Sequence, residues 1–194
     1  LKRAVSAYQR VLHIDPDSPD AHLQLGRAFW QAGELGDARA QMLTHLREAP
    51  GDVPVLLEYG SLLVEMGRHA EAREKFNRVV EIDPRCAAAY HHLAELSLMH
   101  GHDAAATGDL NRALHLDPDR PGVNLMLARL ALNRDDAAGA REALEAELKR
   151  RGHSAAQMLE LGRLLVEANM PNHALDVLYP FISGHHDATL HADA

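Results

Sequence analysis

Apolar residues recur along much of the chain at intervals of three and four residues. Leu56, Tyr59 and Leu63 follow this spacing, and Phe76 and Val79 follow it again further along. Because an α-helix completes a turn every 3.6 residues, residues spaced in this way lie on one face of a helix, where they can pack against a neighbour. The pattern therefore predicts a protein of the all-α class, built from amphipathic helices.

Helix-breaking residues divide this pattern into units of equal length. Prolines recur at steps of 34 residues: Pro16, Pro50, Pro84 and Pro118. Gly152, another helix breaker, occupies the position of a fifth. Proline lacks a backbone N–H and clashes with the preceding helical turn. Each of these residues is therefore expected to end one helix and to set the turn into the next.

Small residues keep the same register as the prolines. One series is always alanine and a second is always glycine or alanine: Ala4, Ala38, Ala72, Ala106, Ala140 and Ala174, then Gly26, Gly60, Ala94, Ala128 and Gly162. Such residues are expected to let the two helices of a hairpin approach closely. A last series of Gly or Asn marks the expected end of the first helix through a left-handed residue, with Asp135 in the one deviant place: Gly33, Gly67, Gly101 and Asn169.

A helical hairpin of 34 residues with these marks resembles the tetratricopeptide repeat. Tyr59, Gly60, Phe76 and Pro84 occupy positions that are typical of that family. The resemblance implies a right-handed superhelical solenoid of antiparallel helix hairpins. We expect a single repeat domain over residues 1–183, followed by a His-rich polar tail at 184–194. Within the domain we expect a half repeat at 1–18 and repeats at 19–52, 53–86, 87–120, 121–154 and 155–183.

Neither end of the array has an evident cap. The first helix, with Tyr8 and Val11, is expected to lack a hairpin partner, and the last is expected to kink or stop near Tyr179 because Pro180 follows. Repeats bury their apolar faces only against neighbours. We therefore expect a longer parent protein, which the start at Leu1 without a methionine also indicates, or pairing of the ends in a homo-oligomer.

In the family, the first helix of each repeat lines a concave groove. Transferring the family's groove positions to this sequence gives a largely apolar set and a polar set: Leu23, Trp30, Leu57, His91, Leu125, Leu132 and Leu159, then Arg27, Glu58, Ser61, His92, Glu95, Arg129 and Arg163. An apolar floor with charged sides suits an extended or amphipathic peptide. Three or four buried anchors of roughly 1.5 kcal/mol each would give an affinity near micromolar.

Two details refine the expected groove. Trp30 is the only tryptophan, and we expect it to contact a partner because aromatic side chains dominate binding surfaces. The carboxylate clamp of chaperone-tail binders in this family is absent. Glu58 stands at one of its positions and would repel a carboxylate, which disfavours a heat-shock co-chaperone role.

The composition of the chain limits the classes of partner that it can bind. The chain has a net charge of −8 with both signs interspersed, which argues against nucleic acid as a ligand. No apolar run is long enough to span or insert into a membrane. The single cysteine, Cys86, cannot form an internal disulfide, so the chain is compatible with the cytoplasm or the bacterial periplasm.

The side chains offer little sign of chemistry. The chain has 14 histidines, but their spacing does not follow a metal-binding pattern, and we expect them to be solvated at the surface. His91 and His92 are adjacent and should project about 100° apart on a helix. Carboxylates are expected on helix surfaces as partners of Lys or Arg, and no nucleophile has a plausible base. We expect no enzyme activity, no metal and no cofactor.

The expected function is therefore a non-catalytic scaffold that binds a segment of another protein in its groove. An alternative remains open: the chain could be a substrate-recognition or regulatory arm of a larger enzyme, of the glycosyltransferase or sulfotransferase type. It could equally belong to a bacterial secretion or exopolysaccharide assembly. Protonation of the histidines below about pH 6.5 would also make partner binding depend on pH.

Overall fold

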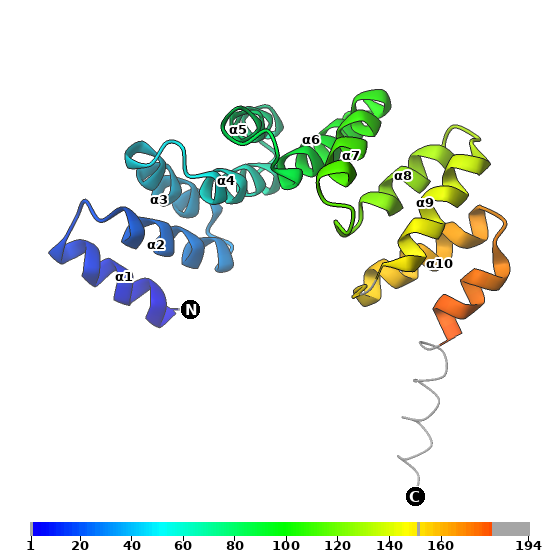
Figure 1. The fold of residues 1–194 in the computed structure, drawn as a ribbon. Helices are drawn as coiled ribbons and strands as arrows, with labels where there is room; N and C mark the ends of the chain where they lie inside the picture. The colour runs from blue at the N-terminus through cyan, green and yellow to red at the C-terminus, as the bar shows by residue number, and fades with distance from the viewer. Residues whose placement is uncertain (1, 151, 180–194) are drawn as a thin grey trace, which may run out of the picture. The chain divides into compact units, whose positions relative to one another are not determined.

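A computed structural model describes residues 2–150 and 152–179, and every described element of secondary structure is a helix. The helices follow one another as hairpins (Figure 1): α1 (Lys2–Ile14), α2 (Pro19–Gln31), α3 (Leu35–Glu48), α4 (Val53–Glu65), α5 (His69–Ile82), α6 (Ala87–Met99), α7 (Asp103–Leu116), α8 (Val123–Leu132), α9 (Ala137–Lys149) and α10 (Ala155–Glu167). Residues 171–179 are helical as well. The prediction of an all-α protein made of sequential helix hairpins is confirmed.

We refer to α2, α4, α6, α8 and α10 as the A helices and to α3, α5, α7 and α9 as the B helices. The A helices begin at Pro19, Val53, Ala87 and Ala155, where repeats were expected to start, with one exception. The exception is α8, which begins at Val123 rather than at Pro121. The preceding Gly122 has φ +81°, a left-handed conformation that a helix cannot continue through, so the helix starts two residues late.

The turns form as the glycine series predicts. Backbone φ angles are positive at all five positions of the series: Gly33, Gly67, Gly101, Asp135 and Asn169. Asp135 and Asn169 both have φ +57°, which L-residues other than Asn and Asp rarely adopt. At the opposite ends, Asp52 caps α4 by accepting from the Val55 N–H, and Ser154 with Gln157 forms a capping box on α10.

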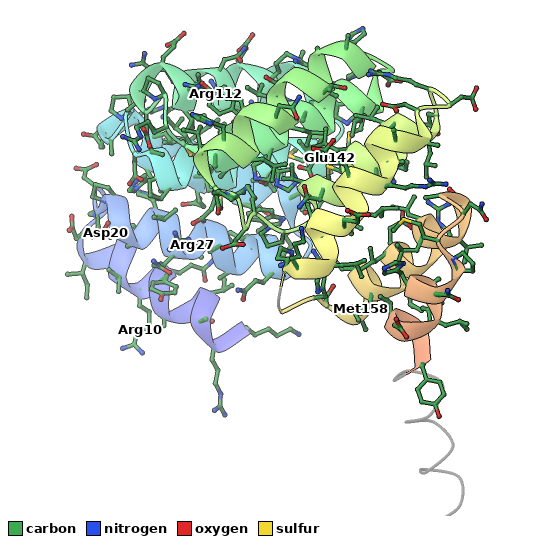
Figure 2. The ribbon with its side chains drawn as sticks, turned by 45° about the vertical axis from the view of Figure 1, so that its right-hand side comes forward. Arg10, Asp20, Arg27, Arg112, Glu142 and Met158 are labelled. Carbon is green, nitrogen blue, oxygen red and sulfur yellow. The ribbon has the colours of Figure 1, made fainter. Side chains whose placement is uncertain are left out.

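The chain divides into two compact units, Leu1–His102 and the part from Asp103 onward. In the first unit, α1 packs on α2, and α2 to α6 pack each on the next. Its core gathers around Tyr59, Phe76 and Leu93, all nearly inaccessible to solvent. α1 contributes no fully buried side chain, and its Arg10 points away from α2 (Figure 2).

In the second unit, α7 packs on α8, α8 on α9, and α10 on both α8 and α9. Its core gathers around Leu144, Leu161 and Leu165. The end of the helix at residues 171–179 coincides with the expected stop near Tyr179, but Pro180 and the predicted His-rich tail at 184–194 lie outside the described residues.

Close packing inside the hairpins depends on the small residues of the sequence pattern. A Cβ added to Gly60 on α4 would lie 2.4 Å from Cε1 of Phe76 on α5, and one added to Gly162 on α10 would lie 2.6 Å from Cδ2 of Leu178. Ala38, Ala72, Ala106 and Ala140 on the B helices are fully buried. The small side chains therefore set the distance between the two helices of a hairpin.

Candidate functional site

The residues predicted to bind a partner all lie on A helices, and we call this set the A-helix face. In the first unit it comprises Leu23, Arg27 and Trp30 on α2, Leu57, Glu58 and Ser61 on α4, and His91, His92 and Glu95 on α6. In the second unit it comprises Leu125, Arg129 and Leu132 on α8, and Leu159 and Arg163 on α10. Each unit therefore carries its own part of the face.

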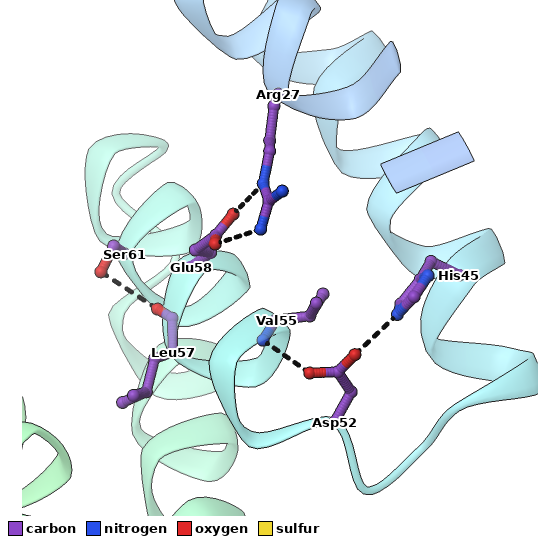
Figure 3. Close-up of polar contacts among 7 residues, drawn as sticks. All are labelled: Arg27, His45, Asp52, Val55, Leu57, Glu58 and Ser61. Carbon is purple, nitrogen blue, oxygen red and sulfur yellow. Dashed lines mark hydrogen bonds and ion pairs between the residues drawn. The ribbon is translucent and has the colours of Figure 1, made fainter. Parts of the chain in front are cut away.

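An ion pair joins the first two A helices. The Arg27 guanidinium donates to both carboxylate oxygens of Glu58, with Nε–Oε2 and Nη2–Oε1 distances of 2.7 and 2.6 Å (Figure 3). The hydrogen bond that Arg27 donates to Glu58 raises the pKa of Arg27 above its usual value. About a third of each side chain is exposed, so the pair is oriented by its own contacts before any partner arrives.

Trp30 is less available for contact with a partner than the sequence analysis expects. Its indole N–H donates to Oε2 of Glu65 on α4 at 2.5 Å, and its ring packs against the core cluster together with Leu57. Leu23 is buried. The apolar part of the face on α2 and α4 is thus partly used by the fold, and only the remaining area of Trp30 and Leu57 faces solvent.

The Ser61 hydroxyl is engaged within its own helix. It donates to the Leu57 carbonyl oxygen at 3.1 Å, one turn earlier on α4 (Figure 3). Toward a partner, this hydroxyl would act chiefly as a hydrogen-bond acceptor, because its proton is already donated to Leu57.

The paired histidines on α6 differ from the prediction. Their rings stack, with centroids 5.8 Å apart and planes inclined by 6°, and His92 also stacks on Phe76 of α5 at 4.8 Å. Nδ1 of His92 lies 2.8 Å from Oε2 of Glu95. The side chains bend toward each other although their Cα–Cβ bonds point apart, so the expected separation of about 100° is not kept by the rings.

The expectation that the histidines are solvated is wrong for several of them. His45 is 4% exposed, with Nδ1 3.0 Å from the Pro19 carbonyl oxygen and Nε2 3.1 Å from Oδ2 of Asp52 (Figure 3). Only 9% of the His153 side chain and 12% of the His91 side chain are exposed. For His45, the two polar partners compensate for the burial of the ring.

In the second unit the A-helix face contains a cavity between α8 and α10. Its volume is ≈ 350 Å³, and Leu125, Arg129 and Arg163 line it together with Gln157 and Glu160. Leu125 itself is buried, and Leu132 packs on the core. Leu159 is 57% exposed and is the most accessible apolar residue of the predicted set.

Charges at this cavity form a connected group. Arg163 donates to both carboxylate oxygens of Glu160, at 3.0 and 2.8 Å, and also bonds Glu167. Arg129 of α8 lies 3.9 Å from Oε1 of Glu160. The hydrogen bonds from Arg163 hold the pKa of Glu160 below its usual value and raise that of Arg163.

The sequence interpretation missed a buried carboxylate. Glu147 on α9 is completely buried, and it accepts from Nδ2 of Asn124 at 3.3 Å and from Nε of Arg150 at 3.1 Å. Nε2 of His153 lies 3.0 Å from the same carboxylate. The expectation that carboxylates lie on helix surfaces is therefore wrong for Glu147, whose charge is compensated inside the protein.

A signal for Glu147 was present in the repeat register. The residues one, two and three repeats earlier are Ala113, Val79 and His45, all of which are buried. A carboxylate at a position that is otherwise buried in each repeat requires partners nearby. Arg150 and His153 follow closely in the sequence and were available for that role.

Two further kinds of feature, metal sites and membrane-spanning helices, are both absent from the part of the chain that the structure describes. In residues 2–150 and 152–179, no group of three or more His, Cys, Asp or Glu side chains is placed to hold a metal ion. Within the same part of the chain, no helix has the length and apolar content needed to cross a bilayer.

The chain is similar in sequence and structure to known proteins. Family profiles described as Tetratricopeptide repeat match residues 1–58 and residues 57–121. Among solved structures, PilF of Pseudomonas aeruginosa is 25% identical with a TM-score of 0.75, covering 92% of this chain and 84% of that one. PilW, described as a widely conserved type IV pilus biogenesis factor, is 19% identical with a TM-score of 0.77, covering 94% of this chain and 84% of PilW. At that level of identity the likeness to PilW establishes the fold alone.

Two curated proteins match part of the chain. Protein CTR9 homolog of Arabidopsis thaliana is 29% identical over 86 residues, which are 44% of this chain and 8% of that protein. Protein O-mannosyl-transferase TMTC2 of Homo sapiens is 29% identical over 86 residues, which are 43% of this chain and 10% of that protein. The chain thus matches a tenth or less of the length of these relatives.

Proposed function

Because the chain belongs to the tetratricopeptide repeat family, we propose that it is a non-catalytic protein-interaction module whose A-helix face binds a segment of another protein. Domains of this family generally serve protein–protein interaction. The segment that fits is extended or amphipathic, since the face combines apolar side chains with charged ones along successive A helices.

The observation that carries this proposal is the cavity between α8 and α10. It offers ≈ 350 Å³ beside the half-exposed Arg129 and Arg163 and is lined by Leu125 at its base. Binding sites of this size typically join apolar walls to a few oriented polar groups. The ion pairs hold the arginine side chains in place, so ordering these side chains on binding would cost little entropy.

Burial limits the affinity that the face can provide. Leu23 and Leu125 are buried, so the accessible apolar anchors are chiefly Leu159 and the free parts of Trp30 and Leu57. Each buried anchor contributes about 1.5 kcal/mol, and association itself costs free energy. The expected affinity is therefore near micromolar or weaker. The partner is therefore expected to exchange readily.

A matched pair of substitutions tests the proposal. Leu159→Glu places a charge on the A-helix face, and Leu175→Glu places the same charge in the helix at residues 171–179, where Leu175 is 64% exposed against 57% for Leu159. Both variants should fold, because both side chains are largely in water. Partner recovery in a pull-down should fall about tenfold for Leu159→Glu, the effect of losing roughly 1.5 kcal/mol. Equal recovery with the two variants would contradict a role for the A-helix face.

A second candidate is that the module is an arm of a larger protein, either an enzyme of the glycosyltransferase or sulfotransferase type or a bacterial secretion or exopolysaccharide assembly. The partial match to a human protein O-mannosyl-transferase favours the enzyme version, since 86 aligned residues are 10% of that protein. The sequence of the complete reading frame distinguishes the candidates. A catalytic domain in the same polypeptide would support the arm, and a reading frame that encodes only repeats would exclude it.

A further inference from the structure

A second surface, on the B helices of the first unit, has features of a binding site. A cleft of ≈ 380 Å³ lies between α3 and α5. Leu46 of α3, together with Leu56 and Tyr59 of α4, provides an apolar floor, and Arg47, Lys75 and Arg78 also line it. Leu56 and Tyr59 are buried core residues, so the floor is fixed by the packing of the unit. None of these residues belongs to the A-helix face.

The charges of this cleft are all positive. Within the described residues, neither Arg47 nor Lys75 forms a hydrogen bond or ion pair through its side chain, whereas Arg78 bonds Glu81 at 2.9 Å. No carboxylate lines the cleft. The cleft is positively charged although the whole chain has a net charge of −8. The field inside the cleft therefore attracts an anionic group.

An equivalent cleft in the second unit shows whether the basic side chains are needed for helix packing. Two repeats further along, α7 and α9 enclose a cleft of ≈ 380 Å³ above α8. There Ala143 and Ala146 stand where the first unit has Lys75 and Arg78, and Leu127 stands where it has Tyr59. Because the same helix arrangement forms with alanine at both positions, packing of the B helices does not require the two basic side chains.

We propose that the cleft between α3 and α5 binds an acidic segment of a partner protein. One apolar side chain of the segment packs on Leu46, Leu56 and Tyr59, and neighbouring carboxylates pair with Arg47, Lys75 and Arg78. The volume is in the range of small-ligand sites, enough for one large side chain with part of its backbone. A purely inorganic anion would leave the apolar floor uncovered, which is why the occupant combines acidic and apolar groups. This surface adds to the A-helix face and does not depend on it.

Fluorescence anisotropy with a defined probe tests this proposal. The probe is a fluorescein-labelled peptide of sequence Asp-Glu-Leu-Glu-Asp, and the variant combines Lys75→Ala with Arg78→Ala, the residues of the equivalent cleft. The control combines Lys2→Ala with Arg10→Ala, which removes the same charge from exposed positions of α1 (Figure 2). We expect the cleft variant to bind at least about tenfold more weakly than wild type, the control to bind as wild type does, and binding to weaken with salt.

Several results would overturn the proposal. Equal affinity of the cleft variant and wild type would do so, as would no binding of the acidic peptide to wild type up to about millimolar concentration. Equal binding of a Lys-Arg-Leu-Arg-Lys peptide would show that charge does not select the ligand. Equal binding of an Asp-Glu-Gly-Glu-Asp peptide would show that the apolar floor is unused.

Fold and location are checked separately. The cleft variant should unfold at the wild-type temperature, because alanine fits both positions in the second unit. Should it unfold early, the single variant Lys75→Gln replaces it in the same titration. Amide resonances of Arg47 and Tyr59 in wild type should shift with the probe, and shifts confined to the A-helix face would overturn the assignment to this cleft. The Leu159→Glu experiment addresses the A-helix face independently, so the two proposals can fail separately.

Discussion

Gly60 and Phe76 show how a single residue sets the spacing of a hairpin. The Phe76 ring lies directly against the backbone of Gly60, where a Cβ would come within 2.4 Å of the ring. Phe76 is fully buried, so its ring has no free space into which to retreat. The sequence pattern predicted close approach of the two helices at Gly60, because a small residue recurs there in register, but it did not identify Phe76 as the contact.

Substitution of two glycines separates this packing effect from helix propensity. We expect Gly60→Ala to destabilise the protein by about 1–3 kcal/mol through overpacking. Gly108 lies inside α7 with nothing within 4 Å of the Cβ position, so Gly108→Ala should stabilise by about 0.5–1 kcal/mol. Urea unfolding of both variants measures the two free energies. A loss of stability in both, or in neither, would show that the contact with Phe76 does not decide the outcome.

Glu147 is a completely buried carboxylate. Its carboxylate pairs with the guanidinium of Arg150, whose side chain is 7% exposed, so removing the carboxylate would take this ion pair from a buried guanidinium. We expect Glu147→Ala to lower the free energy of unfolding by about 3 kcal/mol. Glu145→Ala, at an exposed position of the same helix, should change it by less than about 0.5 kcal/mol.

A double variant checks the cause of that loss. Adding Arg150→Ala to Glu147→Ala also removes the buried guanidinium that lost this ion pair, so part of the stability should return in urea unfolding. Purely additive losses in the double variant would mean that the carboxylate and the guanidinium do not act as a pair.

At the level of helices, the proline and glycine marks predicted the order of the elements and most of their starts. α8 departs from the pattern because a glycine directly after Pro121 adopts a positive φ, a local conformation that the repeat register does not contain. Exposure was less predictable than position. Leu125 and Leu159 occupy the same register position, but Leu125 lies in a core cluster with residues of α10 while Leu159 is 57% exposed.

The link between α8 and α10 gives a pH-dependent prediction. Hydrogen bonds from Arg163 lower the pKa of Glu160, so ionised Glu160 stabilises the folded state above its unfolded-state pKa near 4.5. This contribution is lost as the pH falls through the lower pKa of the folded state. Because about a third of the side chain is exposed, we expect it to be no more than about 1 kcal/mol.

The comparison of Glu160→Gln with wild type in urea unfolding at several pH values measures this term. The difference should be present at pH 7 and should diminish as the pH falls below 4.5 through the lower pKa of the folded state. Glu142→Gln on α9 serves as the control, because Glu142 is exposed and its substitution should leave no such difference (Figure 2). A difference between Glu160→Gln and wild type that is the same at pH 7 and pH 3.5 would contradict a role for ionisation.

At the scale of the whole molecule, repetition is what made the fold predictable. A fixed step of 34 residues determines which residues start, end and space each hairpin, and each hairpin packs on its neighbour in the described units. The same repetition does not determine side-chain partners. The contact of Trp30 with Glu65, the stacking of His91 on His92 and the network of Glu147 each depend on residues that occur in one repeat only.

Site-specific photo-crosslinking in the source cells tests the central claim, that the A helices form the partner-binding surface, most directly. A photoreactive residue would replace Ser61 on α4 or Arg163 on α10, and in controls Ala70 on α5 or Glu145 on α9, which are exposed positions of B helices. We predict that the two A-helix positions capture the same protein and that the two controls capture little of it. Capture of that protein from Ala70 and Glu145, with none from Ser61 and Arg163, would contradict the account.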